Sequence, residues 1–388
     1  MAALTRRLGA QQLELIEDAV QAAMVRALER WPSSEVPDRV EGWLLRVAYN
    51  RAVDAMRRES RLETLPAERG GQMDVPLPAL DDELRLMFLC CHPSLTKAAQ
   101  VALTLKIACG LTVQQIALAF LTNEITIGQR LVRAKQRLRQ VGARFELPDP
   151  EQLPGRLEPI LDVLYLMFSE GYSPTDGEAA IKDELCREAL RLARLLTEQP
   201  STATPAAEAL RALFCFQASR ADARRADDGS LLLLHEQDRG RWDTTLIREG
   251  FCALGRARRG DELSRFHLEA GIAACHAAAP SHQATDWPQI LFLYDALRER
   301  SPSPVVEVNR AIAVAMVSGA PAGLDQLDSI PERELIDSYP YALAAYAELH
   351  TSLGHLDEAR AYLARALEHQ PSQVQRLLLE RKLAGLGR

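Results

Sequence analysis

Apolar residues recur every three or four positions along most of this 388-residue chain, and this spacing predicts helices. Two such stripes lie near the N-terminus: one contains Leu15, Ala19, Ala22, Ala23 and Leu28, and the other Trp43, Leu44, Val47, Ala48, Val53 and Met56. Between them, residues 31–38 contain two prolines and two serines and predict a loop. Ala, Leu, Arg and Glu are abundant and favour helices, so the expected fold class is all-α.

Prolines and glycines divide the chain into segments. Residues 62–79 show little periodicity and predict a linker, and a second junction follows near residue 150; the residues that mark them are Gly70, Gly71, Pro76 and Pro78, then Pro148, Pro150 and Pro154. We therefore expect a first helical domain over 1–61, a linker over 62–79, a second helical domain over 80–145 and a helical array over 155–388.

The array contains a repeat pattern. Its clearest copy, in residues 343–371, has small residues, a turn glycine and a closing proline where a tetratricopeptide (TPR) unit of about 34 residues has them: Ala347, Gly354, Ala359, Leu363, Ala366 and Pro371. Residues 305–319 resemble another first helix, and residues 187–196 another second helix. The pattern predicts a TPR-like array; a generic helical bundle is the alternative. Residues 227–230 predict a tight turn.

Residues 111–139 predict a helix-turn-helix. Thr112 and Gln115 have the spacing of a capping box at the start of the first helix. Residues 121–124 form the expected turn, and a second helix begins near Thr126. The apolar sides of the two helices are expected to contain Ile116, Ala117 and Phe120, and Ile127, Leu131, Ala134 and Leu138.

The second helix of this motif is basic on its remaining surface, as in helices that enter the major groove of DNA. Its first turns supply four candidates for contacts to base edges, namely Thr126, Gly128, Gln129 and Arg130. Its later turns supply four candidates for phosphate contacts, namely Arg133, Lys135, Arg137 and Arg139. A solvated basic face on an ordinary helical hairpin is the alternative, but the cap, the short turn and the basic helix together favour DNA.

Charge is distributed unevenly along the chain. The net charge is −7, yet residues 1–145 carry a net +4 and residues 146–388 a net −11. This asymmetry fits an N-terminal part that binds DNA, and it suggests that the acidic extension repels DNA or covers the recognition helix in an inactive state. Charged residues interrupt the N-terminal segment and every long apolar run, so we expect a cytoplasmic protein without membrane contact.

Enzymatic or metal chemistry finds little support in the sequence. The seven cysteines form no CxxC pair, and their one cluster, Cys90-Cys91-His92, lacks the spacing of a zinc site. There is no phosphate-binding loop, HExxH pair or nucleophile elbow. The histidines are dispersed, and His235 and His267 are interpreted as surface or core residues. We therefore expect no enzyme, metal or cofactor.

Several segments resemble the extracytoplasmic-function (ECF) sigma factors of the sigma-70 family. Residues 17–21 with Ala27-Leu28 resemble the polymerase-docking helix of sigma domain two. Residues 42–54 with Arg57-Arg58 resemble its promoter-melting, −10-reading segment, and residues 111–139 resemble sigma domain four, which reads the −35 element. Residues 82–93, 129–135, 164–172 and 238–243 resemble the subgroup with a long C-terminal TPR-like extension. Here the helix before Glu17 is expected to be short or missing.

The resemblance implies roles for particular residues. Asp18 and Gln21 would bind polymerase; Asn50, Arg51, Arg57 and Arg58 would contact −10 DNA; and residues 31–38 would hold an unstacked base. The implied partners are core RNA polymerase, promoter DNA and a protein or peptide that binds the extension. One alternative is a helix-turn-helix regulator with a TPR sensor that acts independently of core polymerase. Another is a TPR adaptor, which leaves the helix-turn-helix unexplained.

Overall fold

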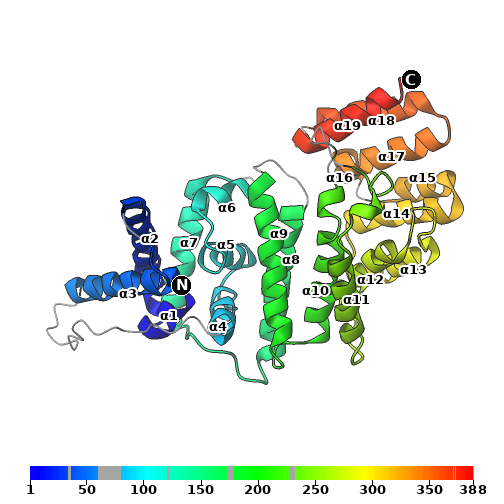
Figure 1. Cartoon of the computed structure of the whole chain (residues 1–388). Coiled ribbons are helices and arrows are strands. Elements are labelled where there is room, and N and C mark those ends of the chain that lie inside the picture. Colours follow the sequence, from blue (N-terminus) through cyan, green and yellow to red (C-terminus); the bar gives the residue numbers. More distant parts are fainter. Residues whose placement is uncertain are drawn as a thin grey trace. The chain divides into compact units, whose positions relative to one another are not determined.

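The computed structural model describes residues 1–33, 36–59, 80–119, 122–172, 179–224, 226, 232–331, 333–369, 371 and 373–387. Every secondary-structure element in these ranges is a helix, which confirms the all-α prediction (Figure 1). The chain divides into two compact units, residues 1–167 (unit 1) and 168–388 (unit 2). None of the described helices is both long enough and apolar enough to cross a membrane.

Unit 1 begins with a short helix, as the sequence predicts. This helix ends at Gly9, whose φ of 90° lies in the region that favours glycine. The helices of unit 1 are α1 (Ala2–Leu8), α2 (Leu13–Arg30), α3 (Val40–Glu59), α4 (Leu80–Cys90), α5 (Lys97–Ile107), α6 (Val113–Ala119) and α7 (Glu124–Gln140), with two short 3-10 turns, η1 (Ala10–Gln12) and η2 (Trp31–Ser33). Helix α8 (Leu153–Tyr172) crosses the boundary between the units.

Helices α1, α2 and α3 share one apolar core. Its buried members are Leu4, Ile16, Ala19, Ala23, Ala48 and Ala52. Four of these are alanines, whose small side chains let α2 and α3 approach each other closely along their length. This core leaves the opposite faces of α2 and α3 exposed to solvent.

Polar groups tie α1, α4 and α8 together within unit 1. The Asp82 carboxylate is completely buried on α4 and forms ion pairs with Arg6 of α1 at 3.0 Å and with Arg85 at 3.3 Å. The Arg156 guanidinium of α8 donates to the Phe88 carbonyl oxygen at 2.9 Å. The two ion pairs compensate the buried Asp82 charge, and the Arg156 bond satisfies a carbonyl oxygen in the last turn of α4.

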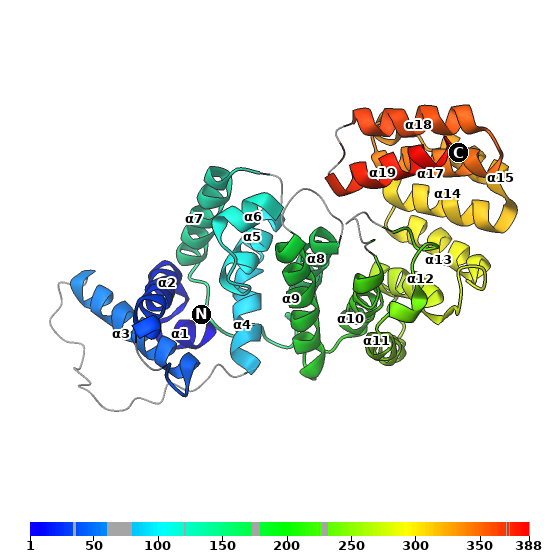
Figure 2. The same cartoon turned by 45° about the horizontal axis from the view of Figure 1, so that its top comes forward.

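Unit 2 is a succession of helices packed side by side (Figure 2). They are α9 (Ala179–Glu198), α10 (Pro205–Ala218), α11 (Thr244–Ala257), α12 (Arg265–Ala278), α13 (Trp287–Arg300), α14 (Pro304–Ser318), α15 (Ala320–Asp328), α16 (Arg333–Asp337), α17 (Pro340–Ser352), α18 (Leu356–Glu368) and α19 (Gln373–Gly385), with two 3-10 turns, η3 (Ala221–Ala223) and η4 (Arg239–Arg241).

The clearest predicted repeat is a helical hairpin formed by α17 and α18. Gly354 lies between them with a φ of 78°, as a tight turn requires. The small residues expected at the helix contact are buried, and they are Ala347, Ala359, Leu363 and Ala366. Residues 305–319 coincide with α14 and residues 187–196 lie in α9, so these two helix predictions are confirmed as well.

Some predictions concern residues outside the described ranges. The linker over 62–79, the turn over 227–230 and the positions of Phe120 and Leu121 belong to this group. The domain boundaries expected at residues 61, 80, 145 and 155 stay predictions.

Candidate nucleic-acid interface

Two side-chain caps fix the geometry of the helix-turn-helix. The Thr112 N–H donates to Gln115 Oε1 at 2.8 Å, and the Gln115 N–H donates to Thr112 Oγ1 at 3.1 Å, which confirms the predicted capping box. At the second helix, the Thr126 N–H donates to Asn123 Oδ1 at 2.7 Å. Asn123 is therefore the N-cap, and α7 begins at Glu124, two residues before the predicted start.

The apolar sides of α6 and α7 face inward, as expected. Ile116 and Ala117 are buried on α6, and four residues at helical spacing are buried on α7, namely Ile127, Leu131, Ala134 and Leu138. Burial of this stripe sets the rotation of α7 about its axis and turns the remaining positions toward solvent.

The predicted DNA-contacting residues of α7 lie on or beside this outer surface. Gln129, Arg133, Arg137 and Arg139 are exposed, whereas Thr126, Gly128 and Arg130 are half-buried. The Lys135 side chain is only 13% exposed. The structure thus provides a basic, accessible helix face, while the individual DNA contacts stay a prediction.

Lys135 is set apart from its neighbours because it pairs with α2. Its Nζ lies 2.5 Å from one carboxylate oxygen of Glu17, and Lys106 Nζ of α5 lies 3.1 Å from the other. All three side chains are at most 13% exposed. One turn away, Arg139 and Glu14 form a looser, exposed pair at 3.7 Å. Helix α7 is therefore joined to α2 through a partly buried cluster of charges.

The predicted −10 residues share one face of α3. Asn50, Arg51, Arg57 and Arg58 are all exposed and lie at positions i, i+1, i+7 and i+8, which coincide on a helix. The Arg58 side chain donates to the Asp54 carbonyl oxygen at 3.2 Å, which holds it along the helix surface. This face is a second basic surface in unit 1.

Two aromatic residues of α3 lie against the rest of the domain. The rings of Trp43 and Trp31 are 5.5 Å apart, and the Arg7 guanidinium lies 5.6 Å from the Tyr49 ring. Both α3 side chains are partly buried, so packing accounts for their presence. Within residues 31–38, where a base-holding pocket is expected, residues 34 and 35 lie outside the described ranges.

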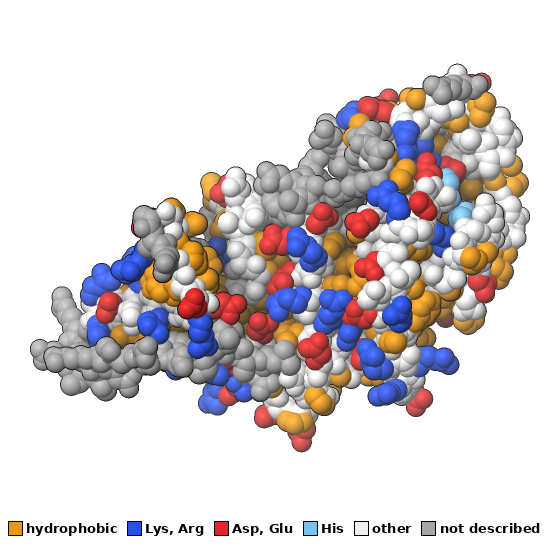
Figure 3. Space-filling view, in the orientation of Figure 1, with side chains coloured by type: hydrophobic (Ala, Val, Ile, Leu, Met, Phe, Trp, Pro, Cys, Tyr) orange, Lys and Arg blue, Asp and Glu red, His pale blue; other side chains and the backbone are white. Residues whose placement is uncertain are grey.

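The predicted polymerase-binding residues lie on the outer face of α2. Asp18 and Gln21 are exposed, and three large apolar side chains beside them are exposed too, namely Met24, Val25 and Leu28, with Leu28 at 74%. The buried face of the same helix contains Ile16, Ala19, Ala23 and Ala27. Figure 3 shows hydrophobic side chains at the surface among charged ones in this region of unit 1. Exposed apolar side chains grouped on one helix are typical of a protein-binding surface.

Other chemically notable residues have structural roles. Cys90 and Cys91 are buried, and burial raises the pKa of Cys91 to about 12, so its thiol stays protonated. His267 accepts from the Ser264 N–H at 3.1 Å and caps α12. Within the described ranges, no group of His, Cys, Asp and Glu side chains is arranged to hold a metal ion.

Comparison with known families matches three parts of the chain. Residues 1–62 match sigma-70 region 2, residues 85–138 match sigma-70 region 4, and residues 156–258 match a family of unknown function (DUF6596). The Uncharacterized protein R00370 of Rhizobium meliloti (strain 1021) is 39% identical over 368 residues, which cover 92% of this chain and 86% of that protein. No solved structure is significantly similar to the chain.

The two sigma matches fall on the two basic surfaces described above. Region 2 contains α2 and α3, and region 4 contains the helix-turn-helix of α6 and α7. The third match begins in α8 and continues into the helical array. The chain therefore belongs to the sigma-70 family of transcription initiation factors, as an ECF-type sigma factor with a helical C-terminal extension.

Proposed function

We propose that this sigma factor binds core RNA polymerase through α2 and directs promoter-specific initiation, with α3 at the −10 element and α7 at the −35 element. The observation that carries the proposal is the presence of two exposed basic helix faces, on α3 and α7, within one sigma-70 chain. Each face is opposite a buried apolar stripe, so both are rigidly presented.

For the −35 element, residues in the early and late turns of α7 are proposed to contact different parts of the DNA. Thr126, Gly128, Gln129 and Arg130 lie in the first two turns, which approach base edges when such a helix enters the major groove. A Cβ added at Gly128 would meet no atom within 4 Å, so internal packing does not require glycine there. A missing side chain at this position allows close approach of DNA. Arg133, Arg137 and Arg139 follow and are suited to phosphate contacts.

The Glu17–Lys135 pair suggests that the described arrangement of unit 1 is a resting state. Lys135 is a candidate phosphate contact, yet its ammonium group is occupied by the Glu17 carboxylate. Contact with DNA requires this pair to separate. Because Glu17 lies one residue from Asp18 on the proposed polymerase-binding helix, docking on polymerase and release of Lys135 would be coupled.

The C-terminal extension is proposed to regulate this DNA binding. Its charge supports the idea, because residues 146–388 carry a net −11 while residues 1–145 carry a net +4. A TPR-like array also supplies the stacked helix surfaces on which protein or peptide partners bind.

Binding to core polymerase separates this proposal from a regulator that acts alone. The full chain is mixed with purified core RNA polymerase and its affinity is measured by fluorescence anisotropy. We expect binding, and we expect Leu28→Glu to weaken it by at least about tenfold, as for a central interface residue. Arg26→Glu, on the flank of the same helix, is the matched control and should have a much smaller effect. Absence of binding by the unmodified chain would favour the polymerase-independent regulator.

A further inference from the structure

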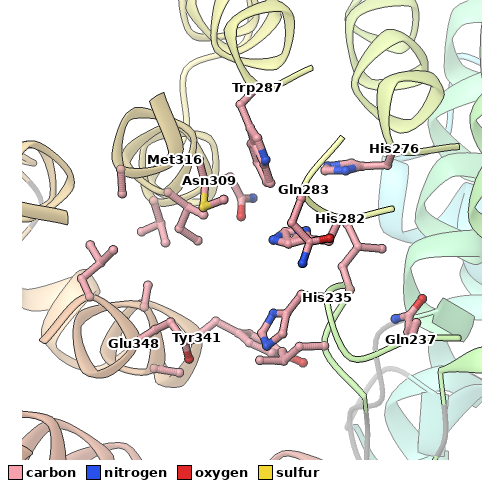
Figure 4. Close-up of a pocket in the computed structure, with 18 of the residues that line it drawn as sticks. His235, Gln237, His276, His282, Gln283, Trp287, Asn309, Met316, Tyr341 and Glu348 are labelled. Carbon is pink, nitrogen blue, oxygen red and sulfur yellow. The ribbon is translucent and has the colours of Figure 1, made fainter. Parts of the chain in front are cut away.

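Unit 2 contains a cavity of about 1090 Å³ that the sigma function does not use. It lies between α13, α14, α17 and α19 and two loops, over residues 233–240 and 280–283. Figure 4 shows how side chains reach into it from several directions: His235, His282 and Gln283 from the loops, Trp287 from α13, Asn309 and Met316 from α14, and Tyr341 and Glu348 from α17. Its size is slightly above the range of about 300–1,000 Å³ for pockets that take drug-sized molecules, so such a molecule would fit.

Aromatic and imidazole rings gather at one end of this cavity. The Trp287 ring meets His276 edge-on at 5.4 Å and His282 edge-on at 5.5 Å, and His235 lies 5.6 Å from His282. The Trp287 Nε1 atom and the Nδ1 atoms of His276 and His282 are buried and have no hydrogen-bond partner among the described residues. A buried polar atom without a partner is unfavourable, so a molecule that forms a hydrogen bond with it gains affinity.

His276 and His282 are uncharged at neutral pH. Burial, followed by the nearby Arg220 and Arg239 guanidinium groups, lowers the pKa of His276 to about 3. Burial and the neighbouring His235 also lower the pKa of His282. These rings therefore offer neutral hydrogen-bonding groups and flat surfaces rather than positive charge.

The charged side chains that line the cavity already have partners. Lys382 and Glu348 pair with each other. Arg239 donates to the carbonyl oxygens of His276 and Ala279 at 2.5 and 2.7 Å and lies 4.5 Å from the Trp242 ring, although its buried Nη2 atom has no partner. Asp238 accepts from the Gly240 N–H. The charged lining residues are two acids and two bases, so the described lining has no net charge to attract an ionic ligand.

Besides polar side chains such as Asn309 and Gln283, much of the remaining lining is apolar and partly aromatic. Its members include Val305, Val308, Ile312, Met316, Leu349 and Tyr339. Burial of apolar ligand surface against such walls supplies most of the binding energy, at about 25 cal/mol per Å². The few polar atoms at the Trp287 end then fix the ligand's orientation.

We propose that this cavity binds a neutral, planar organic molecule of drug-like size that bears a hydrogen-bond acceptor for the Trp287 indole N–H. The bound molecule stacks against the imidazole rings at the Trp287 end and buries its apolar part against α14 and α17. The extension is thereby a small-molecule receptor. This goes beyond the proposed role in initiation and does not depend on it.

The test uses the full chain and Nile red, a neutral planar dye with a carbonyl acceptor, whose fluorescence rises on binding. We expect saturable one-site binding. Met316→Arg places a charge on the cavity wall and should weaken binding more than about tenfold, as the loss of an apolar contact region implies. Phe292→Arg is the matched control, because Phe292 is also exposed but does not line the cavity. Trp287→Phe keeps an aromatic ring, although a smaller one, and removes the N–H donor, and should weaken binding about threefold to tenfold.

Several outcomes would overturn the proposal. Equal effects of Met316→Arg and Phe292→Arg would place the dye elsewhere. Tighter one-site binding of the anionic dye 1-anilinonaphthalene-8-sulfonate, lost on Met316→Glu, would assign an anion site centred on Arg239. Displacement of Nile red by short peptides but never by a neutral heterocycle such as benzimidazole would assign a peptide groove. Thermal melting of each variant confirms folding, and the assay contains no polymerase or DNA, so its failure is distinct from failure of the initiation proposal.

Discussion

The Glu17 carboxylate of α2 and the Lys135 ammonium of α7 form an ion pair at 2.5 Å, although 118 residues separate them in the chain. Lys106 completes the cluster at 3.1 Å. One partner lies on the helix that carries the polymerase-binding candidates and the other on the helix that carries the −35 candidates. This pair of side chains thus connects the proposed polymerase-binding helix with the proposed −35 helix.

Removal of the Glu17 charge should loosen unit 1. Glu17→Gln leaves two largely buried ammonium groups without a counter-charge, and we expect the free energy of unfolding to fall by about 2–4 kcal/mol. Urea unfolding followed by circular dichroism measures it. The matched control is Glu14→Gln, whose pair with Arg139 is exposed and should contribute less than about 0.5 kcal/mol.

Glu17→Gln should also strengthen DNA binding, although it lowers the stability of unit 1. Once Lys135 is released, it can neutralise one more phosphate, so the dependence of log affinity on log salt should steepen by about one unit. Electrophoretic mobility shifts with −35 duplexes at several salt concentrations measure this slope. An unchanged slope in Glu17→Gln would show that Lys135 does not reach DNA.

The residues of α7 proposed to read bases and those proposed to bind phosphate should respond differently to substitution. Arg137→Ala should weaken binding to all duplexes alike and reduce the salt slope by about one. Gln129→Ala should instead cost about 1–3 kcal/mol on the preferred sequence and relax the preference at one base pair. Arg144→Ala, an exposed position beyond α7, is the control for general loss of positive charge. Identical behaviour of the Gln129 and Arg137 variants would argue against the assigned division of roles.

Local sequence patterns predict the helices and their caps well. The Thr112–Gln115 capping box and the α17–α18 hairpin with its turn at Gly354 depend on residues close together in the chain, so the spacing alone specifies them. The start of the second helix is predicted less accurately, because residues 123 and 124 are assigned to the turn. In the structure the Thr126 N–H donates to the Asn123 side chain, which caps the helix two residues earlier.

Side-chain contacts between residues that are far apart in the chain could not be predicted from the sequence. Nothing near Glu17 indicates that its partners are Lys106 and Lys135, because ordinary solvated helix faces also carry such charges. The histidines look dispersed along the chain for the same reason. His276 and His282 lie on separate elements and contact Trp287 only when the array folds, and His235 then contacts His282.

Because α14 and α15 pack closely, replacement of Gly323 by alanine should destabilise unit 2. A Cβ at this position would lie 2.5 Å from the Ala315 Cβ and 3.1 Å from the Ala311 carbonyl oxygen. We expect Gly323→Ala to destabilise unit 2 by about 1–3 kcal/mol, as overpacking does. Gly255→Ala is the control, because Gly255 lies at an exposed position within α11 and an added Cβ would have no atom within 4 Å. This substitution should stabilise the helix by about 0.5–1 kcal/mol. Thermal melting should therefore move in opposite directions for the two variants.

Glu249 should make unit 2 sensitive to acid. Hydrogen bonds from Arg194 and Arg211, at 2.7–3.1 Å, lower the pKa of this α11 carboxyl from its ordinary 4.5 to about 2. Because the folded-state pKa lies below the unfolded one, the stabilisation is complete above about pH 5 and disappears as the pH falls toward 2. Glu249→Gln should thus be less stable than the unmodified chain in urea at pH 7, with the gap narrowing at pH 4 and further at pH 3. A constant gap across this range would contradict the assigned cause.

In vitro transcription tests the central claim most directly. The full chain is added to purified core RNA polymerase with fragmented genomic DNA from the source organism as template, and transcript 5′ ends are sequenced. We predict discrete start sites that share upstream elements near −10 and −35, and their loss in a variant with Arg51, Arg57 and Arg58 of α3 changed to alanine. Transcription no different from that of core polymerase alone would contradict the assignment of this chain as an initiation factor.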